Sequence, residues 1–214
     1  MPMGYPLPFH SRHLIELQLE LECVAVAAGD TLVPIPCPNP DGPVRFSVVR
    51  HDDTWSTFFR HDLPDQTRAQ LAALAPEQAF HEHERVKAIL DRDAPCAELW
   101  AGVSYVFPDT LTVALYPDAV RLDDTAAYAI VADGRVVATC SSSRENAACA
   151  EAWVTTEPAY RRRGYARQVV AAWAHDLQRR GKLPFYSHLR HNIASRAVAR
   201  SLGLVQFLAA VGYL

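Results

Sequence analysis

The chain has no apolar run long enough to span a membrane, which argues against a transmembrane protein. Its formal net charge is −3 at pH 7, so it lacks the basic surplus that is typical of nucleic-acid-binding proteins. The first residues also lack the charged-then-apolar layout of a secretion signal. We therefore expect a cytoplasmic protein that binds neither membranes nor nucleic acids.

Cysteine spacing gives no sign of a zinc site or a disulfide framework. The sequence contains five cysteines, an odd number, and no CxxC pair. They are Cys23, Cys37, Cys96, Cys140 and Cys149. We expect reduced thiols, as in a cytoplasmic protein. The segment His81–Glu84 has a metal-like spacing, but no third ligand accompanies it, so we predict no bound metal.

The composition predicts a folded protein, because 50% of the 214 residues are hydrophobic and 21% are charged. In the first part of the chain, Ser11 could cap a helix that ends near Gly29, although the alternation of apolar residues there also fits a strand. Residues 32–43 contain five prolines and predict a connector. The β-branched and aromatic residues of Val44–Arg60 then predict a hairpin with its turn near His51–Asp53.

Two helices and two apolar runs are expected next. The first helix opens at Pro64, where a proline costs little, and the second covers Glu77–Leu90. Trp100–Pro108 predicts a strand, and Leu111–Tyr116 forms another short apolar run.

Clearer signals begin at Thr125. The pair Asp133-Gly134 suits a tight hairpin turn with positive φ. The expected elements are two strands joined at this turn, a strand over Ala148–Thr156, a helix over Gly164–Arg180, a strand over Leu183–Leu189, a helix over Asn192–Leu202 and a last strand from Leu204. This order predicts a mixed sheet with helices packed against it.

The segment Tyr160–Val170 places three arginines, residues 161–163, directly before a helix. The N-terminal end of a helix already carries partial positive charge, so cations there are unfavourable unless an anion binds. Gly164 would let the backbone approach such an anion closely, and Ala166 would keep the start of the helix slim. A polyphosphate would account for the arrangement, whereas three arginines alone would also fit a solvated surface.

The spacing Arg161-x-x-Gly164-x-Ala166, after a strand and opening a helix, matches R/Q-x-x-G-x-G/A. It resembles the acyl-CoA pyrophosphate loop of the GNAT superfamily of N-acetyltransferases. The glycines and lysine of a Rossmann or Walker motif are absent.

A second segment also resembles this superfamily, which often carries N-x-x-[SA]-x-x-x-[YA]-x-x-x-G. Here Asn192, Ser195, Ala199 and Gly203 stand at those positions, and the first three share one helix face. Asn192 could equally be a plain helix cap. The resemblance covers Thr125–Leu204.

The resemblance implies an α/β (α+β) protein of GNAT type, with a mixed, mostly antiparallel sheet flanked by helices. It places the acetyl-CoA-binding core in residues 116–214. Residues 1–115 would form an N-terminal α+β extension, either on the acceptor side or as a remnant GNAT-like half.

The implied cofactor is acetyl-CoA. The backbone of the strand before the loop would bind the pantetheine arm, the loop would bind the pyrophosphate, and the second motif would lie beneath the pantetheine and the thiol. The residues implied to bind the cofactor are Val154, Thr156, Arg161, Arg162, Arg163, Gly164, Tyr165, Ala166, Asn192 and Ser195.

The implied reaction is direct attack of a primary amine on the thioester in a ternary complex. Glu151 is the candidate base, because family members place a glutamate nearby. Its position is off by one, so its side chain would lie on the wrong face unless a bulge intervenes, and a plain strand carboxylate is the alternative.

The general acid is less clear, because Ala199 stands where many family members carry a tyrosine. The thiolate could leave unaided or be protonated by another side chain. The candidates are Ser195, Tyr186, His188 and Tyr213.

Three questions stay open. A non-catalytic acyl-CoA sensor is the main alternative function, and transfer of a longer acyl group or to a hydroxyl is another. The acceptor could be a small molecule or a peptide amine. Only about eleven residues follow Gly203, so a strand missing from the sheet would come from the N-terminal region or, in a homodimer, from a partner by exchange.

Overall fold

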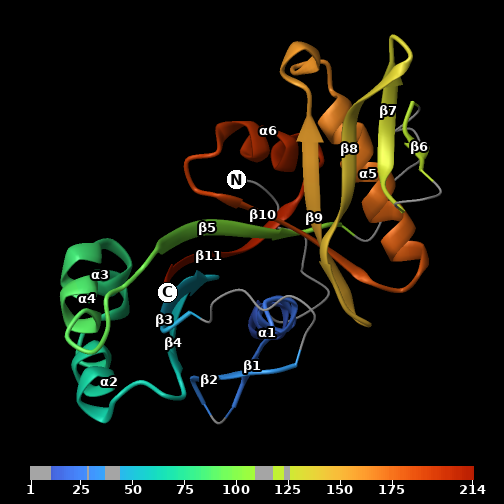
Figure 1. Cartoon of the computed structure of the whole chain (residues 1–214). Coiled ribbons are helices and arrows are strands. Elements are labelled where there is room, and N and C mark those ends of the chain that lie inside the picture. Colours follow the sequence, from blue (N-terminus) through green and yellow to red (C-terminus); the bar gives the residue numbers. More distant parts are fainter. Residues whose placement is uncertain (1–10, 28, 37–43, 109–117, 123–125) are drawn as a thin grey trace. The chain divides into compact units, whose positions relative to one another are not determined.

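The structure, a computed structural model, describes residues 11–27, 29–36, 44–108, 118–122 and 126–214 (Figure 1). They fall into two compact units: Met1–Val103 with Phe207–Leu214, and Ser104–Gln206. The expected domain division after residue 115 stays a prediction. The apolar run Leu111–Tyr116 and residues 37–43 of the proline-rich segment lie outside the described residues.

The first unit combines helices with short strands. Its elements are α1 (Ser11–Leu21), β1 (Val24–Val26), β2 (Thr31–Pro34), β3 (Phe46–His51), β4 (Thr54–Arg60), α2 (Asp65–Ala72), α3 (Pro76–His81) and α4 (His83–Leu90). Two further strands, β5 (Leu99–Val106) and β11 (Val205–Tyr213), contribute residues to both units.

The strands β3 and β4 form the predicted hairpin, with Asp52 at a positive φ of 49° in the turn. On its other side β3 pairs antiparallel with β11, from Phe46 opposite Tyr213 to Arg50 opposite Ala209. The N-terminal region therefore supplies a neighbour for the last strand, which is one of the two sources that the sequence left open. Aromatic rings gather beneath this pairing, where the ring centroid of Phe46 lies 5.1 Å from that of Phe59 and 6.0 Å from that of Tyr213.

Two expectations for this unit are wrong in detail. The first helix stops at Leu21, and strand β1 follows instead of a continuation to Gly29. The second helix of the predicted pair is split in two at Glu82, whose φ of −90° and ψ of 62° are not helical. The pattern of apolar residues continues past Leu21 and past Glu82. Such a pattern indicates which side chains are buried, but it does not show where the backbone leaves the helical conformation.

The cysteine prediction also needs a correction. Cys23 is disulfide-bonded, so the expectation that all thiols are reduced is wrong for this residue. Cys96, Cys140 and Cys149 are buried and form no disulfide bond. Spacing along the chain does not reveal which cysteines the fold brings together, and for that reason the absence of a CxxC pair was misleading.

Among the described residues, five strands and two α-helices lie wholly within the second unit. Its elements are β6 (Val120–Arg121), β7 (Tyr128–Ala132), β8 (Arg135–Glu145), β9 (Cys149–Thr156), a 3-10 turn (Pro158–Tyr160), α5 (Tyr165–Arg179), β10 (Leu183–Leu189) and α6 (Ile193–Ser201). The strand order is β6-β7-β8-β9-β10, and only the β9–β10 pair is parallel. The predicted fold class, a mixed and mostly antiparallel sheet flanked by helices, is confirmed.

Local signals in this unit agree with the structure. Asp133 and Gly134 have positive φ angles of 52° and 73°, as the predicted tight turn between β7 and β8 requires. Helix α5 packs against the sheet, and its middle residues, 169–174, are all buried. None of the helices in the described ranges has the length and apolar character needed to cross a membrane.

Candidate functional site

The parallel strands β9 and β10 are paired over only part of their length. Their register runs from Cys149 opposite Leu183 to Glu151 opposite Phe185. Beyond this point β9 continues to Thr156 while staying paired with β8 on its other side. The backbone groups of β9 that face β10 after Glu151 therefore have no strand partner, and the two strands diverge there.

A cavity of about 700 Å³ opens where the strands diverge. Three parts of the second unit line it: the end of β9 with the loop that follows it, the first turn of α5, and helix α6 with one residue of β10. The lining residues are Val154, Thr155, Thr156, Tyr160, Arg161, Arg162, Gly164, Tyr165, Ala166, Arg167, Tyr186, Asn192, Ala194, Ser195, Ala197, Val198 and Ser201. Nine of the ten residues predicted to bind the cofactor are among them, and Arg163 is the exception.

The backbone before α5 forms an anion-binding concavity. Gly164 caps the helix with a φ of 82°, and no side chain caps it. Arg162 also has a positive φ, 63°, which is uncommon for a residue with a side chain. Left-handed residues in such a turn aim successive N–H groups at one point, and the first N–H groups of a helix have no intrahelical acceptor. A β-carbon at Gly164 would meet no atom within 4 Å, so the space in front of it is open.

The three arginines of the loop lie in different places. Arg161 and Arg162 line the cavity, and the Nε of Arg161 donates to the carbonyl oxygen of Thr156 at 3.3 Å. The guanidinium of Arg163 lies instead 4.9 Å from the centre of the Tyr160 ring. A further cation, Arg167 in the first turn of α5, lines the cavity. Arg167 could have been predicted from the sequence, because side chains in the first turn of a helix lie near an anion bound at its N-terminus.

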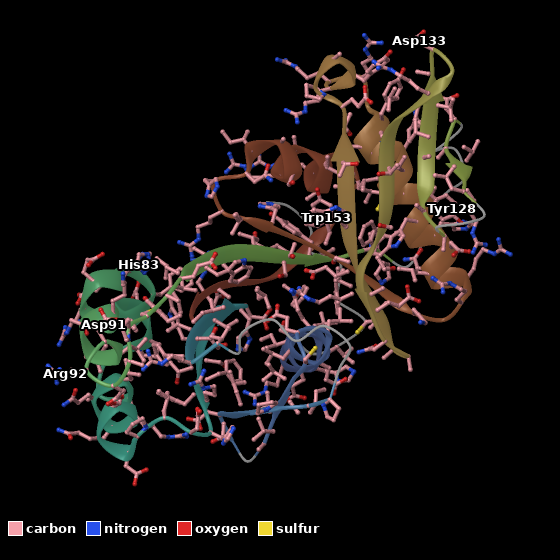
Figure 2. All side chains as sticks on the ribbon, viewed as in Figure 1. His83, Asp91, Arg92, Tyr128, Asp133 and Trp153 are labelled. Atoms are coloured by element: carbon pink, nitrogen blue, oxygen red, sulfur yellow. The ribbon has the colours of Figure 1, made fainter. Side chains whose placement is uncertain are left out.

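Tyr160 holds the loop in this shape. Its hydroxyl donates to the Oδ2 of Asp133 at 2.5 Å, so the loop is tied to the turn between β7 and β8, where Figure 2 labels Asp133. The guanidinium of Arg135 also lies over its ring, 5.1 Å from the centre. Because its guanidinium lies against the ring of Tyr160, Arg163 also helps to hold the loop in place.

Three buried polar atoms of the cavity lining have no hydrogen-bond partner among the described residues. They are the Oγ1 of Thr156, the Nε of Arg167 and the hydroxyl of Tyr186. Buried polar atoms are nearly always paired in native proteins, so unpaired ones that share a cavity indicate a polar ligand. Burial raises the pKa of Tyr186 to about 12, and the neighbouring Ser195 side chain opposes part of the rise.

The second motif lies on α6, where two of its residues, Asn192 and Ser195, line the cavity and a third, Ala199, does not. The Oδ1 of Asn192 accepts a hydrogen bond from the backbone N–H of Ser195 at 3.0 Å, so Asn192 caps the helix. Both residues also line the cavity, so the cap and the cofactor contact are compatible. Ala199 is only 1% exposed and does not line the cavity.

Glu151 lies outside the cavity lining and is 5% exposed. Its Oε2 accepts from the Nη1 of Arg144 at 3.0 Å, and its Oε1 accepts from the hydroxyl of Ser187. Because Glu151 is directly opposite Phe185, their side chains share a sheet face, and Tyr186 points to the other face. The role of Glu151 as a base stays a prediction.

A register shift between β8 and β9 occurs at the level of Glu151, close to where a bulge was considered. It lies between Ser142 and Arg144, so the additional residue, Ser143, is in β8 and not in β9. The hydroxyl of Ser143 donates to the carbonyl oxygen of Glu151 at 3.2 Å. The bulge therefore brings Arg144 opposite Glu151 and leaves the side-chain alternation of β9 unchanged.

The face of β9 that carries Glu151 also presents Trp153, which Figure 2 labels. Its side chain is 63% exposed, an unusual position for a tryptophan. Sequence reasoning missed this residue because a strand pattern alone does not reveal which face a neighbouring element covers.

The two other candidate acids, Tyr213 and His188, are not among the residues that line the cavity. The hydroxyl of Tyr213, in the first unit, donates to the carbonyl oxygen of Ala79 at 3.1 Å. The Nδ1 of His188 is 2.8 Å from the carbonyl oxygen of Leu189, and its ring stacks on Tyr105 with centroids 5.5 Å apart. In the part of the chain that the structure describes, no three His, Cys, Asp or Glu side chains gather as a metal site.

Comparison with known proteins gives one family. Residues 123–208 match the family model described as GNAT acetyltransferase. None of the curated proteins matches the chain.

Several solved structures are similar at low identity. An acetyltransferase of the GNAT family from Colwellia psychrerythraea is 11% identical with a TM-score of 0.49, over 74% of this chain and 75% of that protein. A GCN5-related N-acetyltransferase from Kribbella flavida is 14% identical with a TM-score of 0.43, over 99% and 95%. An acetyltransferase of the GNAT family from Novosphingobium aromaticivorans is 19% identical with a TM-score of 0.46, over 55% of this chain and 65% of that protein.

The ion pair between the part-exposed Arg144 and the buried Glu151 predicts a stability effect. We expect Arg144→Met to lower the free energy of unfolding by about 2 to 3 kcal/mol, because the carboxylate of Glu151 then stays buried without its cation. The additional change Glu151→Gln should recover part of this loss, since an amide can bond Ser187 without a charge. Urea unfolding of both variants checks the prediction, which is wrong if the double variant is less stable than Arg144→Met.

Proposed function

Because residues 123–208 belong to the GNAT acetyltransferase family, we propose that the chain transfers the acetyl group of acetyl-CoA to a primary amine. The cavity between the diverging strands β9 and β10 carries this proposal. One part of the cavity is the cationic start of α5, which suits the anionic end of a ligand. The other part is the gap beside the unpaired backbone of β9, which suits a long arm that contains amide groups.

The residues of the cavity fit acetyl-CoA by charge and by polarity. Arg161, Arg162 and Arg167 surround the N-terminus of α5 with positive charge, which suits a diphosphate. The unpartnered hydroxyls of Thr156 and Tyr186 suit the polar groups of the arm and the thioester. A volume of about 700 Å³ is within the range of cofactor sites. When bound, acetyl-CoA would supply an activated acetyl thioester.

The binding roles follow from this geometry. The N–H groups from Arg162 to Ala166 would bind the diphosphate, and the free edge of β9 at Val154 and Thr156 would bond the amides of the arm. Asn192 uses its Oδ1 in the helix cap, so its NH₂ group is left to donate to the cofactor.

In the proposed reaction the neutral amine attacks the acetyl carbon, and the bond between carbon and sulfur breaks. An amine with a pKa of about 10 is protonated at neutral pH, so a group must accept its proton. Glu151 keeps the role of base in this proposal. Its carboxylate is bound by Arg144 and Ser187, so the acceptor would have to replace one of them.

Trp153 and Glu151 together would receive the acceptor. They lie on the same face of β9, and an exposed tryptophan binds a cation through the face of its ring. The acceptor would reach the thioester from this face, while the cofactor occupies the cavity lined by α5 and α6.

The test is release of the CoA thiol from acetyl-CoA in the presence of a panel of amines that includes polyamines, amino acids and peptides. We expect release that depends on the amine and yields the acetylated product by mass spectrometry. Tight binding of acetyl-CoA by calorimetry without release on any amine would favour the sensor, a second function that Ala199 and the ion-paired Glu151 support.

Gly164 and Gly134 form a matched pair for the binding mode. Both have positive φ, 82° and 73°, and open space where a β-carbon would be built. Changing either to alanine should cost about 1 to 2 kcal/mol of stability through backbone strain. Only Gly164 lines the cavity, so only Gly164→Ala should raise the dissociation constant of acetyl-CoA, by about tenfold or more. Equal affinities of the two variants in calorimetry would contradict this binding mode.

Glu151→Gln tests the proposed base. We expect turnover to fall about 100-fold while the affinity for acetyl-CoA stays unchanged, since Glu151 does not line the cofactor cavity. The control is Glu145→Gln, which changes a carboxylate of the neighbouring strand β8 that pairs with Lys182 at 2.7 Å. If the Glu151→Gln variant turns over as fast as the control, Glu151 is not the base.

A further inference from the structure

Tyr186 lines the cavity from strand β10. It is the first residue of β10 after the last pair with β9, Phe185 opposite Glu151, so it stands where the two strands begin to diverge. Its side chain is 1% exposed, and its hydroxyl is buried in the cavity lining without a hydrogen-bond partner among the described residues. A hydroxyl in this position is costly for the free protein unless a ligand pairs with it.

The surroundings of Tyr186 leave its hydroxyl available to a ligand. The hydroxyl of Ser195 on α6 also lines the cavity, and it lowers the pKa of Tyr186 against the effect of burial, as a donor to the phenolic oxygen does. That contact leaves the phenolic proton of Tyr186 for a ligand. The ring of His188 lies on the same face of β10, 6.4 Å from the Tyr186 ring between centroids. Tyr186 thus brings a hydrogen-bond donor to the cavity from strand β10.

The two ends of the cavity orient its ligand. The helix start at Gly164 and the arginines around it attract the anionic end, whereas the strand junction at Tyr186 carries no charge in the lining. A ligand anchored by its phosphates at α5 therefore extends its other end toward Tyr186. For the cofactor of the proposed function, on which this inference rests, that end is the thioester.

We propose that the hydroxyl of Tyr186 donates a hydrogen bond to the sulfur of the cofactor and stabilises the thiolate as it leaves. In this step the bond between the acetyl carbon and sulfur breaks, its electron pair goes to sulfur, and the acetyl group is bonded to the amine nitrogen. The proton that the nitrogen loses goes to the base. The phenolic proton stays on the oxygen of Tyr186.

The acidity of the two groups explains why the proton stays. Burial raises the pKa of Tyr186 to about 12, whereas a thiol has a pKa of roughly 8.5. Complete transfer from the phenol to the thiolate is therefore unfavourable, but a hydrogen bond to a charged sulfur is favourable. Tyr186 then donates a hydrogen bond to the sulfur without transferring its proton. It would take the place of the tyrosine that many family members carry at the position of Ala199.

The test uses coenzyme A itself and measures its thiol in the bound state. The ultraviolet absorbance of the thiolate is followed from pH 6 to pH 11 with the protein in excess, in the wild-type chain and in Tyr186→Phe. A donor that stabilises the thiolate keeps the pKa of the bound thiol low. We therefore expect this pKa to be about one unit higher in Tyr186→Phe, which corresponds to a tenfold change in the ionisation constant.

Tyr105→Phe is the matched control, because Tyr105 is also buried in the second unit and stacks on His188 but does not line the cavity. It should leave the pKa of the bound thiol unchanged. Ser195→Ala distinguishes the other hydroxyl near the sulfur. If Ser195→Ala raises the thiol pKa and Tyr186→Phe does not, the donor is Ser195 and the inference is wrong.

Affinity and turnover complete the test. We expect Tyr186→Phe to bind acetyl-CoA within threefold of the wild type, which also shows that it folds, and to turn over about tenfold more slowly. A large loss of affinity with an unchanged thiol pKa would mean that Tyr186 only binds the arm of the cofactor, and would overturn the inference. A wild-type chain that does not bind coenzyme A would overturn the proposed function as well, so the two failures are distinguishable.

Discussion

The separation of β9 from β10 is the constraint on which the rest of the candidate site depends. Two parallel strands that stop pairing after Glu151 and Phe185 leave a row of backbone N–H and C=O groups without partners. Such groups are costly when buried, so the gap is stable only if it is filled by water or by a ligand with amide groups of its own. The cavity lies at this gap, and the unpaired hydroxyls of Thr156 and Tyr186 face into it. Backbone groups and side-chain hydroxyls that lack hydrogen-bond partners among the described residues thus lie together at this gap.

Charge is distributed around this gap in an ordered way. The left-handed Arg162 and Gly164 turn the backbone so that α5 begins with its N–H groups toward the cavity, and the cations around them suit a phosphate. Arg163, at the centre of the same turn, is diverted to the ring of Tyr160. Tyr160 is in turn bonded to the β7–β8 turn, so a strained loop is held in place by contacts outside the cavity. In the proposed binding mode, Arg161 and Arg162 would therefore bind the phosphates, whereas Arg163 supports the loop.

The groups that could move protons are separated by the sheet. Glu151 lies on one face, in an ion pair with Arg144, and Tyr186 lies on the other, in the lining of the cavity. This separation fits a reaction in which the acceptor and the cofactor approach the same gap from opposite faces. In the proposed reaction the two residues would have different tasks. The carboxylate would accept a proton from the amine, and the phenol, whose pKa is raised by burial, would stabilise the thiolate without protonating it.

The sequence by itself determined the features that depend on neighbouring residues. The turn at Asp133-Gly134, the cations at the start of α5 and the helix cap of Asn192 are all set within a few residues of backbone, and the two motifs led to the family found for residues 123–208. Tertiary structure alone decided which residues meet across the chain: the pairing of β3 with β11, the ion pair that engages Glu151, and the unpartnered hydroxyl of Tyr186. These depend on strand register and on contacts between distant segments, and local sequence carries no record of either.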